Sequence, residues 1–336
     1  MQKSVTIYDI AKASGCSPAT VSLALNNDDR VRKETKRRIQ EKAAELDYRP
    51  SYFGRSLITG KSKTIKVVLP DIHNPVFVNI LDGIESYIGK TEYHLVLEVT
   101  NNDKEKEINS FASLLGSQVD GVIISPIYEK EVTDYLLEKK IDLQKVIYAC
   151  SSCSGSDQIH YCVADSQLGA YKGVRNMLVN GCRRVAFLAP TVSKLQGSNR
   201  MEGYWQALQE QGIARDDSLI IHCSQDFHEI YERVSTLLKE QKPDGIFCLY
   251  DYAAIPVLKA AADLHLRVPE DLMVTGYDDI EIVEFLEKPL TTVNTHLKEQ
   301  GHYAAEMMIS LLEGKECPIR NVFEPDLVVR KTTGVK

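Results

Sequence analysis

Residues 5–26 read VTIYDIAKASGCSPATVSLALN, and this stretch predicts two short helices joined by a tight turn. Thr6 can cap the first helix, and Gly15 stands where a turn needs a positive φ. Ser17 and Pro18 then begin a second helix, because serine is a favoured cap and proline suits the first helical position. A helix, a glycine turn and a helix is the arrangement that places the second helix in the major groove of DNA.

Each expected helix of this region has an apolar side. In the first helix we expect that side to contain Tyr8, Ile10, Ala11 and Ala13. In the second, the residues expected to face inward are Val21, Ala24 and Leu25, and those expected to face outward are Pro18, Ala19, Thr20, Ser22 and Leu23. A third helix, from about residue 32 to 46, should bury Ile39, Ala43 and Leu46 and expose Lys33, Lys36, Arg37 and Arg38.

The charge is divided unevenly along the chain. Residues 1–63 hold 13 Lys and Arg against 7 Asp and Glu, a net charge of +6, whereas the remaining residues have a net charge of −13. A basic head on an acidic body indicates that the head meets a polyanion from which the body is repelled.

Together with Val31-Arg-Lys-Glu-Thr35 and Leu46-Asp-Tyr-Arg-Pro50, this head resembles the headpiece of LacI/GalR-family repressors. The resemblance implies phosphate contacts from Thr6, Tyr8, Ser17, Thr20, Ser22, Asn26, Thr35 and Tyr48. It implies base contacts from Pro18, Ala19 and Leu23, and we add Arg30 and Arg32 to the expected DNA-binding residues. None of the three base-contacting residues can form a bidentate hydrogen bond, so we expect apolar contacts, for instance with thymine methyl groups.

Residues 50–63 are expected to form a hinge helix and linker. Ser51-Tyr-Phe-Gly-Arg-Ser-Leu57 resembles the hinge helix of the same family, which implies DNA contacts from Ser51, Gly54 and Leu57. Leu57 takes the position of the leucine that wedges into the minor groove and kinks the duplex. A flexible linker with an incidental leucine is the alternative.

From Thr64 onward, short apolar runs alternate with helical segments, a pattern typical of parallel sheets. We expect strands at 65–69, 93–99, 121–125, 145–148, 184–188, 218–221, 245–249, 272–275 and 327–330. The predicted fold class is an all-α helix-turn-helix headpiece followed by an α/β sensor of two Rossmann-like lobes. The expected domains are residues 1–49, the hinge at 50–63, and the sensor at 64–336. Within the sensor, the N-lobe takes 64–160 and a return near 292–322, and the C-lobe takes 161–291 and 323–334.

The sensor is similar to that of the same family, and hence to type I periplasmic binding proteins. The similarity rests on segments such as Leu69-Pro-Asp-Ile-His-Asn-Pro-Val-Phe77, Arg200-Met-Glu-Gly-Tyr204 and Thr275-Gly-Tyr-Asp-Asp279. It implies that Arg200 and Asp278 bind an effector, and charge-assisted hydrogen bonds from such a pair suit a sugar. The other expected effector contacts are Asp71, Asn74, Phe77, Ser125, Gln196, Phe227, Tyr250 and Asp251. A structural bridge between the lobes is the alternative for Arg200 and Asp278.

Two residues depart from the family pattern. Cys150 stands where many relatives end the fourth strand with aspartate, and Tyr250 stands where sugar-binding relatives often have a short polar residue. The usual sugar contact from the fourth strand is therefore missing here. A smaller, more apolar or differently oriented ligand is one consequence that we consider.

Enzyme classes have little support in the sequence. No GxGxxG follows the first strand and no GxxxxGK[ST] is present, and the histidines lack triad or metal-ligand spacing. We therefore expect no catalytic residue, no metal and no cofactor, although Cys150-Ser-Ser-Cys153 leaves a redox switch open. With no apolar run of about 18 residues and no export signal, we expect a cytoplasmic protein that does not contact a membrane.

These features predict a homodimeric repressor of carbohydrate-utilisation genes that binds a pseudo-palindromic operator in double-stranded DNA. A small-molecule effector, a sugar or sugar phosphate in the cleft between the lobes, should control it. Two alternatives are the same architecture with a non-sugar metabolite, and a sugar-binding protein without a role in transcription. The basic head argues against the second. Whether the effector releases or recruits the repressor does not follow from the sequence.

Overall fold

The computed structural model describes residues 5–25, 27–48, 61–190, 194–224 and 226–334, with the backbone alone for residues 190 and 194–198. It divides the chain into two compact units, Met1–Ser62 and Lys63–Lys336. We call the first the head and the second the body. In the described part of the chain, no helix is both long enough and apolar enough to cross a membrane.

The described residues of the head form three helices: α1 (Ile7–Ser14), α2 (Pro18–Leu25) and α3 (Lys33–Glu45). At the start of α1, the Asp9 carboxylate accepts hydrogen bonds from the N–H and the hydroxyl of Thr6, at 2.8 and 2.7 Å. The helix ends at Gly15, whose φ of 67° is readily available only to glycine. Ser17 Oγ accepts the Thr20 N–H at 3.1 Å and so caps α2. The helices predicted for residues 6–46 are therefore confirmed.

The core of the head is small and drawn from all three helices. Its buried apolar members are Ile10, Ala11, Val21, Ala24, Val31, Ile39 and Ala43. We expected Tyr8 and Ala13 on the packed side of α1, and this is wrong. Both residues are exposed, and 74% of Tyr8 is accessible to solvent. The helical spacing instead turns the row formed by Ile7, Ile10, Ala11 and Ser14 toward the core. Leu23, which we expected to face outward, is half-buried against this core.

The first sheet of the body has strand order β2-β1-β3-β4-β5-β11, and all neighbouring strands are parallel. Its strands are β1 (Thr64–Leu69), β2 (His94–Val99), β3 (Gly121–Ile124), β4 (Val146–Ala149), β5 (His160–Ala164) and β11 (Arg320–Phe323). Side chains of α5 (Pro75–Ile88) and α13 (Leu297–Leu312) cover one face. The other face packs against α6 (Lys104–Asn109), α7 (Ala112–Leu115) and α8 (Glu129–Glu138), and η1 (Leu143–Lys145) leads into β4.

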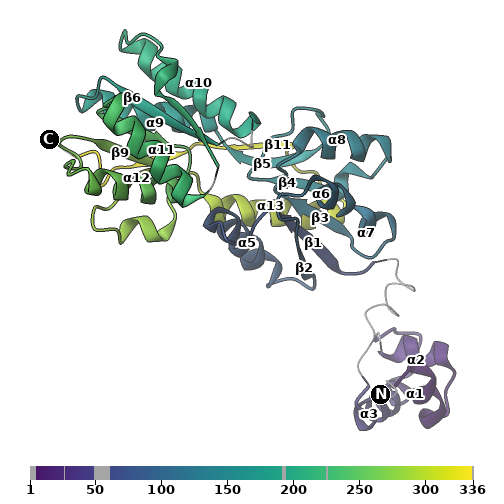
Figure 1. Ribbon diagram of the computed structural model, residues 1–336. Helices are drawn as coiled ribbons and strands as arrows, with labels where there is room; N and C mark the ends of the chain where they lie inside the picture. Colours follow the sequence, from purple (N-terminus) through teal and green to yellow (C-terminus); the bar gives the residue numbers. More distant parts are fainter. Residues whose placement is uncertain (1–4, 26, 49–60, 191–193, 225, 335–336) are drawn as a thin grey trace. The chain divides into compact units, whose positions relative to one another are not determined.

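The second sheet has strand order β7-β6-β8-β9-β10-β12, parallel except for the antiparallel pair β10 and β12. Its strands are β6 (Val185–Pro190), β7 (Ile220–Cys223), β8 (Gly245–Cys248), β9 (Met273–Tyr277), β10 (Thr291–Asn294) and β12 (Asp326–Val328). The helices α9 (Ser166–Val179) and α10 (Lys194–Glu210) cover one face, and α11 (Phe227–Glu240) and α12 (Asp251–Asp263) the other (Figure 1). Two 3-10 helices, η2 (Asp217–Leu219) and η3 (Glu281–Glu284), lie in the connections.

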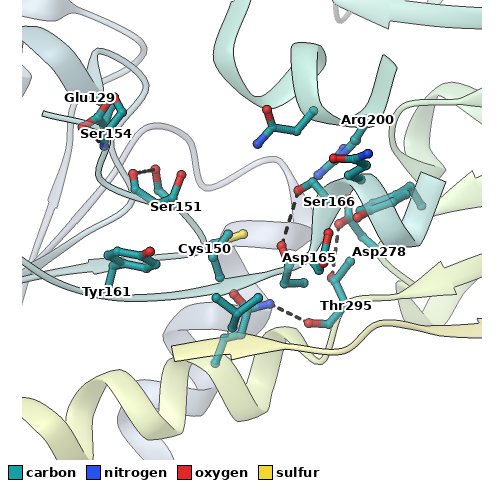
Figure 2. Close-up of a pocket in the computed structure, with 18 residues that line it drawn as sticks. Glu129, Cys150, Ser151, Ser154, Tyr161, Asp165, Ser166, Arg200, Asp278 and Thr295 are labelled. Atoms are coloured by element: carbon teal, nitrogen blue, oxygen red, sulfur yellow. Dashed lines mark hydrogen bonds between the residues drawn. The ribbon is translucent and has the colours of Figure 1, made fainter. Parts of the chain in front are cut away.

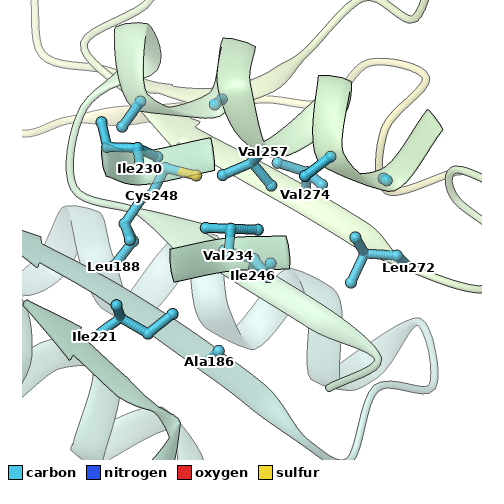
Figure 3. Close-up of a cluster of buried hydrophobic side chains, with 14 of the residues drawn as sticks. Ala186, Leu188, Ile221, Ile230, Val234, Ile246, Cys248, Val257, Leu272 and Val274 are labelled. Carbon is cyan, nitrogen blue, oxygen red and sulfur yellow. The ribbon is translucent and has the colours of Figure 1, made fainter. Parts of the chain in front are cut away.

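Strand β8 shows why the apolar runs of the body are continuous rather than alternating. Ile246 and Cys248 join the cluster beneath α11 and α12, whereas Phe247 and Leu249 join the cluster on the opposite face. Figure 3 shows the first cluster, with Val257 of α12 above the strands. A strand covered by helices on both faces needs an apolar residue at each position. The fold class predicted from these runs is thus confirmed.

The chain passes between the two sheets after β5, after β10 and after β11. Our expected lobe boundaries differ from these crossings by a few residues. Residues 161–164, expected in the second lobe, belong to β5 of the first, and residues 292–294, expected in the first lobe, belong to β10 of the second. The sequence analysis predicts no strand at β5, β10 or β11, because short strands with polar or exposed positions lack an apolar run. In β11 the side chains alternate between exposed and half-buried.

Candidate functional site

The start of α2 is the part of the head best suited to contact a polyanion. Ser17, Pro18 and Ala19 are exposed there, and the hydroxyls of Ser17 and Thr20 lie 2.8 Å apart. Backbone N–H groups without helical partners and a positive dipole end make such a helix start favourable for phosphate. Pro18 and Ala19 add an apolar surface beside the hydroxyls. The geometry therefore provides for phosphate contacts and methyl contacts at one place.

The other expected DNA-binding residues divide by exposure. Thr6, Tyr8, Arg30 and Arg32 are exposed, while Thr20, Ser22, Leu23, Thr35 and Tyr48 are half-buried. The hinge expected at 50–63 is described only from residue 61, and Asn26, Ser51, Gly54 and Leu57 lie outside the described residues.

Arg30 is engaged within the head. Its Nε and Nη2 donate to the Asp28 carboxylate at 2.9 and 2.7 Å. The hydrogen-bonded Arg30 side chain holds the pKa of the Asp28 carboxyl well below its ordinary value. A phosphate contact by Arg30 would thus compete with this exposed ion pair, which is a weak type of interaction in water.

The body contains a cavity of about 340 Å³ between its two lobes. Figure 2 shows the lining side chains, which come from the first turns of α8, α9 and α13, from the loop after β4, from β5, α10 and β11, and from the end of β9 and the residues just after β9 and β10. The lining residues are Glu129, Cys150, Ser151, Ser152, Ser154, Tyr161, Val163, Ala164, Asp165, Ser166, Gln167, Asn199, Arg200, Tyr277, Asp278, Thr295, Gln300 and Val322.

Arg200 and Asp278, the two residues expected to bind an effector most directly, both line this cavity. The Arg200 guanidinium lies 3.8 Å above the centre of the Tyr277 ring and donates a hydrogen bond to the Leu249 carbonyl. Asp278 follows β9 with a φ of 103°, is 5% exposed, and accepts a hydrogen bond from Thr295 Oγ1 at 3.3 Å. A positive φ at a residue other than glycine is uncommon and is a frequent feature of functional sites.

Burial sets the electrostatics of this part of the cavity. It raises the pKa of the Asp278 carboxyl, and the nearby Arg200 guanidinium and the Thr295 hydroxyl act in the opposite direction. It also raises the pKa of the Cys150 thiol to about 12, to which the negative charge of Asp278 contributes. Cys150 is therefore a neutral thiol near pH 7, and burial likewise raises the pKa of Cys153. Neither cysteine is in a disulfide, and this environment disfavours the thiolate that a redox switch requires.

Three buried polar atoms of cavity-lining residues have no hydrogen-bond partner among the described residues: Arg200 Nε, the Tyr277 hydroxyl and Gln300 Oε1. The amide nitrogen of the same Gln300 is bound to the Thr295 carbonyl at 2.5 Å, which fixes the side chain. An unpartnered buried donor or acceptor costs about 1–3 kcal/mol. A ligand that offers both an acceptor and a donor would remove this cost.

The end of the cavity in the first lobe is formed by residues that the sequence analysis did not identify. Ser154 donates to Glu129 through its N–H, at 3.1 Å, and through its hydroxyl, at 2.8 Å. Ser151 and Tyr161 line the same end of the cavity, and Figure 2 shows Ser151 between this pair and Tyr161. The run of three serines between 151 and 154 follows the carboxyl end of a parallel strand, where ligands of such sheets bind. The position of these serines directly after a strand is the sequence feature that could have identified them as candidate ligand contacts.

Seven expected effector residues are described but do not line this cavity: Asp71, Asn74, Phe77, Ser125, Phe227, Tyr250 and Asp251. Asn74 caps α5 by accepting the Val76 N–H at 3.1 Å. Asp251, only 1% exposed, accepts the Ile280 N–H at 2.9 Å and the Thr292 hydroxyl at 2.5 Å, and burial raises the pKa of its carboxyl. The side chain of Gln196 lies outside the described residues. The seven follow β1, β3 and β8 or begin α11 and α12, whereas the cavity lies beside the passages between the lobes.

Comparison with known proteins gives matches to both units. A family described as "Bacterial regulatory proteins, lacI family" matches residues 6–51, and one described as "Periplasmic binding protein-like domain" matches residues 174–333. The HTH-type transcriptional repressor PurR of Vibrio vulnificus is 30% identical over 331 residues, covering 97% of this chain and 98% of the relative. The ribose operon repressor of Haemophilus influenzae is 29% identical over 329 residues, with the same two coverages.

Solved structures share the fold over nearly the whole length. The lac repressor dimer bound to operator and the anti-inducer ONPF is similar with a TM-score of 0.87 and 23% identity, covering 98% of this chain and 99% of that one. The complex of the transcriptional regulator CelR with cellobiose has a TM-score of 0.73 and 24% identity, with the same coverages.

Proposed function

Because the chain belongs to the lacI family of bacterial regulatory proteins and is a DNA-binding transcriptional repressor rather than an enzyme, we propose that it binds a pseudo-palindromic operator as a homodimer and that a small neutral sugar in its cavity controls this binding. Both operator binding and gene control take place where the chromosome is, so the proposal locates the protein in the cytoplasm.

The exposed start of α2 supports the DNA half of the proposal. Ser17 and Thr20 provide hydroxyls for phosphates, and Pro18 and Ala19 provide methyl and methylene groups for bases. We propose that A·T pairs dominate the half-site, because these side chains cannot form the bidentate hydrogen bonds that select guanine. Two copies related by a twofold axis would read the two halves of a palindrome.

One observation carries the effector half: the Arg200 guanidinium, stacked on Tyr277 beside the Asp278 carboxyl, has a buried Nε without a partner among the described residues. A hydroxyl can accept from a guanidinium and donate to a carboxylate at the same time. Adjacent sugar hydroxyls therefore match this pair better than a purely acidic or purely basic ligand does.

The charge of the cavity favours a neutral sugar over a sugar phosphate. Among the described lining residues, Arg200 is the single cation, against the carboxyls of Glu129, Asp165 and Asp278. A phosphate would add about two negative charges to this surplus. The name of the ribose operon repressor and the cellobiose in the CelR complex agree with a sugar ligand, although each describes that other protein. A non-sugar metabolite such as a nucleobase is the alternative.

The DNA half is tested by selecting bound duplexes from a random pool at moderate salt. We expect enriched pseudo-palindromes with A·T pairs in each half-site, and a gel shift on the enriched duplex that random DNA does not displace. Enrichment of a guanine-dominated site would contradict the proposed apolar readout. Failure to enrich any duplex, with and without candidate sugars, would contradict operator binding.

The effector half is tested by thermal shift with neutral sugars, their phosphates, and nucleobases. We expect a neutral sugar to raise the melting temperature, and Arg200→Lys to weaken the effect because lysine loses the planar stack and the fork of donors. Arg215→Lys is the matched control: Arg215 also stacks on an aromatic ring, 4.5 Å from the centre of Trp205, but outside the cavity. If a nucleobase raises the melting temperature and none of the sugars does, the effector is a non-sugar metabolite and the sugar assignment is wrong.

A further inference from the structure

The cavity extends beyond Arg200 and Asp278 to the turn that follows β4. We propose that this turn, residues 150–154, and the Glu129 carboxylate beneath it form a second subsite, which binds a hydroxyl-bearing group distant from the one held by Arg200 and Asp278. The effector would then be an elongated neutral molecule, of which a disaccharide is the simplest example. This inference rests on the proposed function of the cavity as a sugar site.

The backbone of the turn directs its serines to the cavity. Cys150 has a φ of 57°, in the left-handed region, and so bends the chain sharply at the end of β4. After this bend, Ser151, Ser152 and Ser154 all line the cavity. Figure 2 shows Ser151, Ser154 and Glu129 at one end of the cavity and Arg200 and Asp278 at the other, with Cys150 between them.

Glu129 holds the turn and keeps capacity for a ligand. Its Oε1 accepts from the Ser154 N–H at 3.1 Å and from the Thr133 hydroxyl at 3.2 Å, and its Oε2 accepts from the Ser154 hydroxyl at 2.8 Å. An ionised carboxylate offers about four acceptor positions, and the fourth is shared with the Cys153 thiol, a weak donor that a ligand hydroxyl can replace. The side chain is 5% exposed and lines the cavity, so a ligand group is the suitable partner for that position.

The hydrogen bonding at this end also defines which group fits. Because Ser154 gives its proton to Glu129, its oxygen meets a ligand as an acceptor, as does Oε2. The subsite therefore favours a group that donates, such as a sugar hydroxyl. Among the described residues, this end has no Lys, Arg or His, which disfavours a phosphate or carboxylate there.

The test compares matched sugars on the full chain by titration calorimetry: glucose with maltose and cellobiose, and galactose with lactose. We expect one disaccharide to bind about tenfold or more tightly than its component monosaccharide, the change that one hydrogen bond to a charged group gives. Ser154→Ala should remove this advantage and leave the affinity for the monosaccharide unchanged. Glu129→Gln should do the same, and it serves as the second variant.

Two controls make the same chemical changes nearby. Ser156→Ala alters the same loop, and Glu131→Gln alters the exposed side of α8, and neither residue lines the cavity. Both should bind the disaccharide as the unaltered chain does.

The outcomes separate the subsite from the function on which it rests. If the monosaccharide binds as tightly as every disaccharide, or if Ser154→Ala leaves the disaccharide affinity unchanged, the subsite is refuted while the sugar assignment stands. If no sugar binds and a nucleobase does, the sugar assignment itself fails, and the subsite fails with it.

Discussion

The close packing of α9 on α10 makes a strong prediction about Gly203, which lies one turn after Arg200 on α10. A Cβ built on Gly203 would lie 2.1 Å from the Gln167 carbonyl oxygen and 2.9 Å from the Tyr171 nitrogen, both in the backbone of α9. In Gly203→Ala the two helices must therefore separate. Bringing the first distance from 2.1 Å to the closest realistic value of 3.0 Å requires a shift of about 0.9 Å.

The expected loss of stability follows from two opposing effects. Overpacking a tight interface costs about 1–3 kcal/mol, and we take the upper part of that range, about 2–3 kcal/mol, because the obstacle here is backbone, which yields less than a side chain. Alanine in place of glycine within a helix returns about 1 kcal/mol. We therefore expect Gly203→Ala to lower the free energy of unfolding by about 1–2 kcal/mol. The same shift moves Arg200 relative to the Tyr277 ring, so any ligand that stabilises the unaltered chain should stabilise this variant less.

Urea unfolding at fixed protein concentration measures the effect, and Gly116→Ala is the matched control. At Gly116 the φ is −83° and the nearest atom to a built Cβ is 3.6 Å away, so alanine fits without strain. The control should be as stable as the unaltered chain or slightly more stable, by about 0.4–1 kcal/mol. A Gly203→Ala variant that equals or exceeds the stability of the unaltered chain would show that α9 and α10 do not pack this closely.

Other predictions concern single side chains. Ser17→Ala should weaken operator binding by about 1 kcal/mol because the proposed hydrogen bond from its hydroxyl to a phosphate is lost, as measured by fluorescence anisotropy; unchanged affinity would contradict a role for this hydroxyl. Since the pKa of Asp278 is raised above 3.8, calorimetry should show affinity for a neutral sugar rising with pH through that raised value, as the carboxyl becomes an acceptor, and Asp278→Asn should abolish the trend. The raised pKa also means that the protonated Asp278 carboxyl stabilises the folded state. This contribution to the free energy of unfolding is fully present below pH 3.8 and is lost as pH rises through the raised pKa. Cys150 should react with iodoacetamide far more slowly in the folded chain than in urea, because burial raises its thiol pKa to about 12, and equal rates would contradict that burial.

Strands with an apolar run could be predicted from the sequence, whereas short strands with polar or exposed positions could not. Strands covered by helices on both faces, such as β8, are buried and contain no charged residue, so they are readily found in the sequence as apolar runs. Strand β11 is the edge of its sheet with partly exposed positions, and β5 begins with a histidine bound to the Pro318 carbonyl. Such strands are defined by their neighbours in the sheet, and local sequence does not contain that information.

Predictability of the site was limited by a similar cause. Arg200 and Asp278 were found through motifs that the family resemblance assigns, and both line the cavity. The residues of the other end come together only because the loop after β4 reaches the start of α8, which is a tertiary contact. Asp251 shows how the sequence can leave a role open. It begins α12 after β8, in the position of a ligand-binding residue, and its carboxylate accepts hydrogen bonds from the Ile280 N–H and the Thr292 hydroxyl within the second lobe.

The passages after β5, β10 and β11 affect how the protein is made. Neither lobe is a continuous stretch of chain: the first needs α13 and β11, which leave the ribosome after nearly all of the second lobe. During synthesis, the sheet that begins at residue 64 lacks its last strand until residue 323 has emerged. A ribosome that stalls between residues 297 and 323 would thus leave both lobes incomplete, and the partly made chain would expose both lobes to proteases.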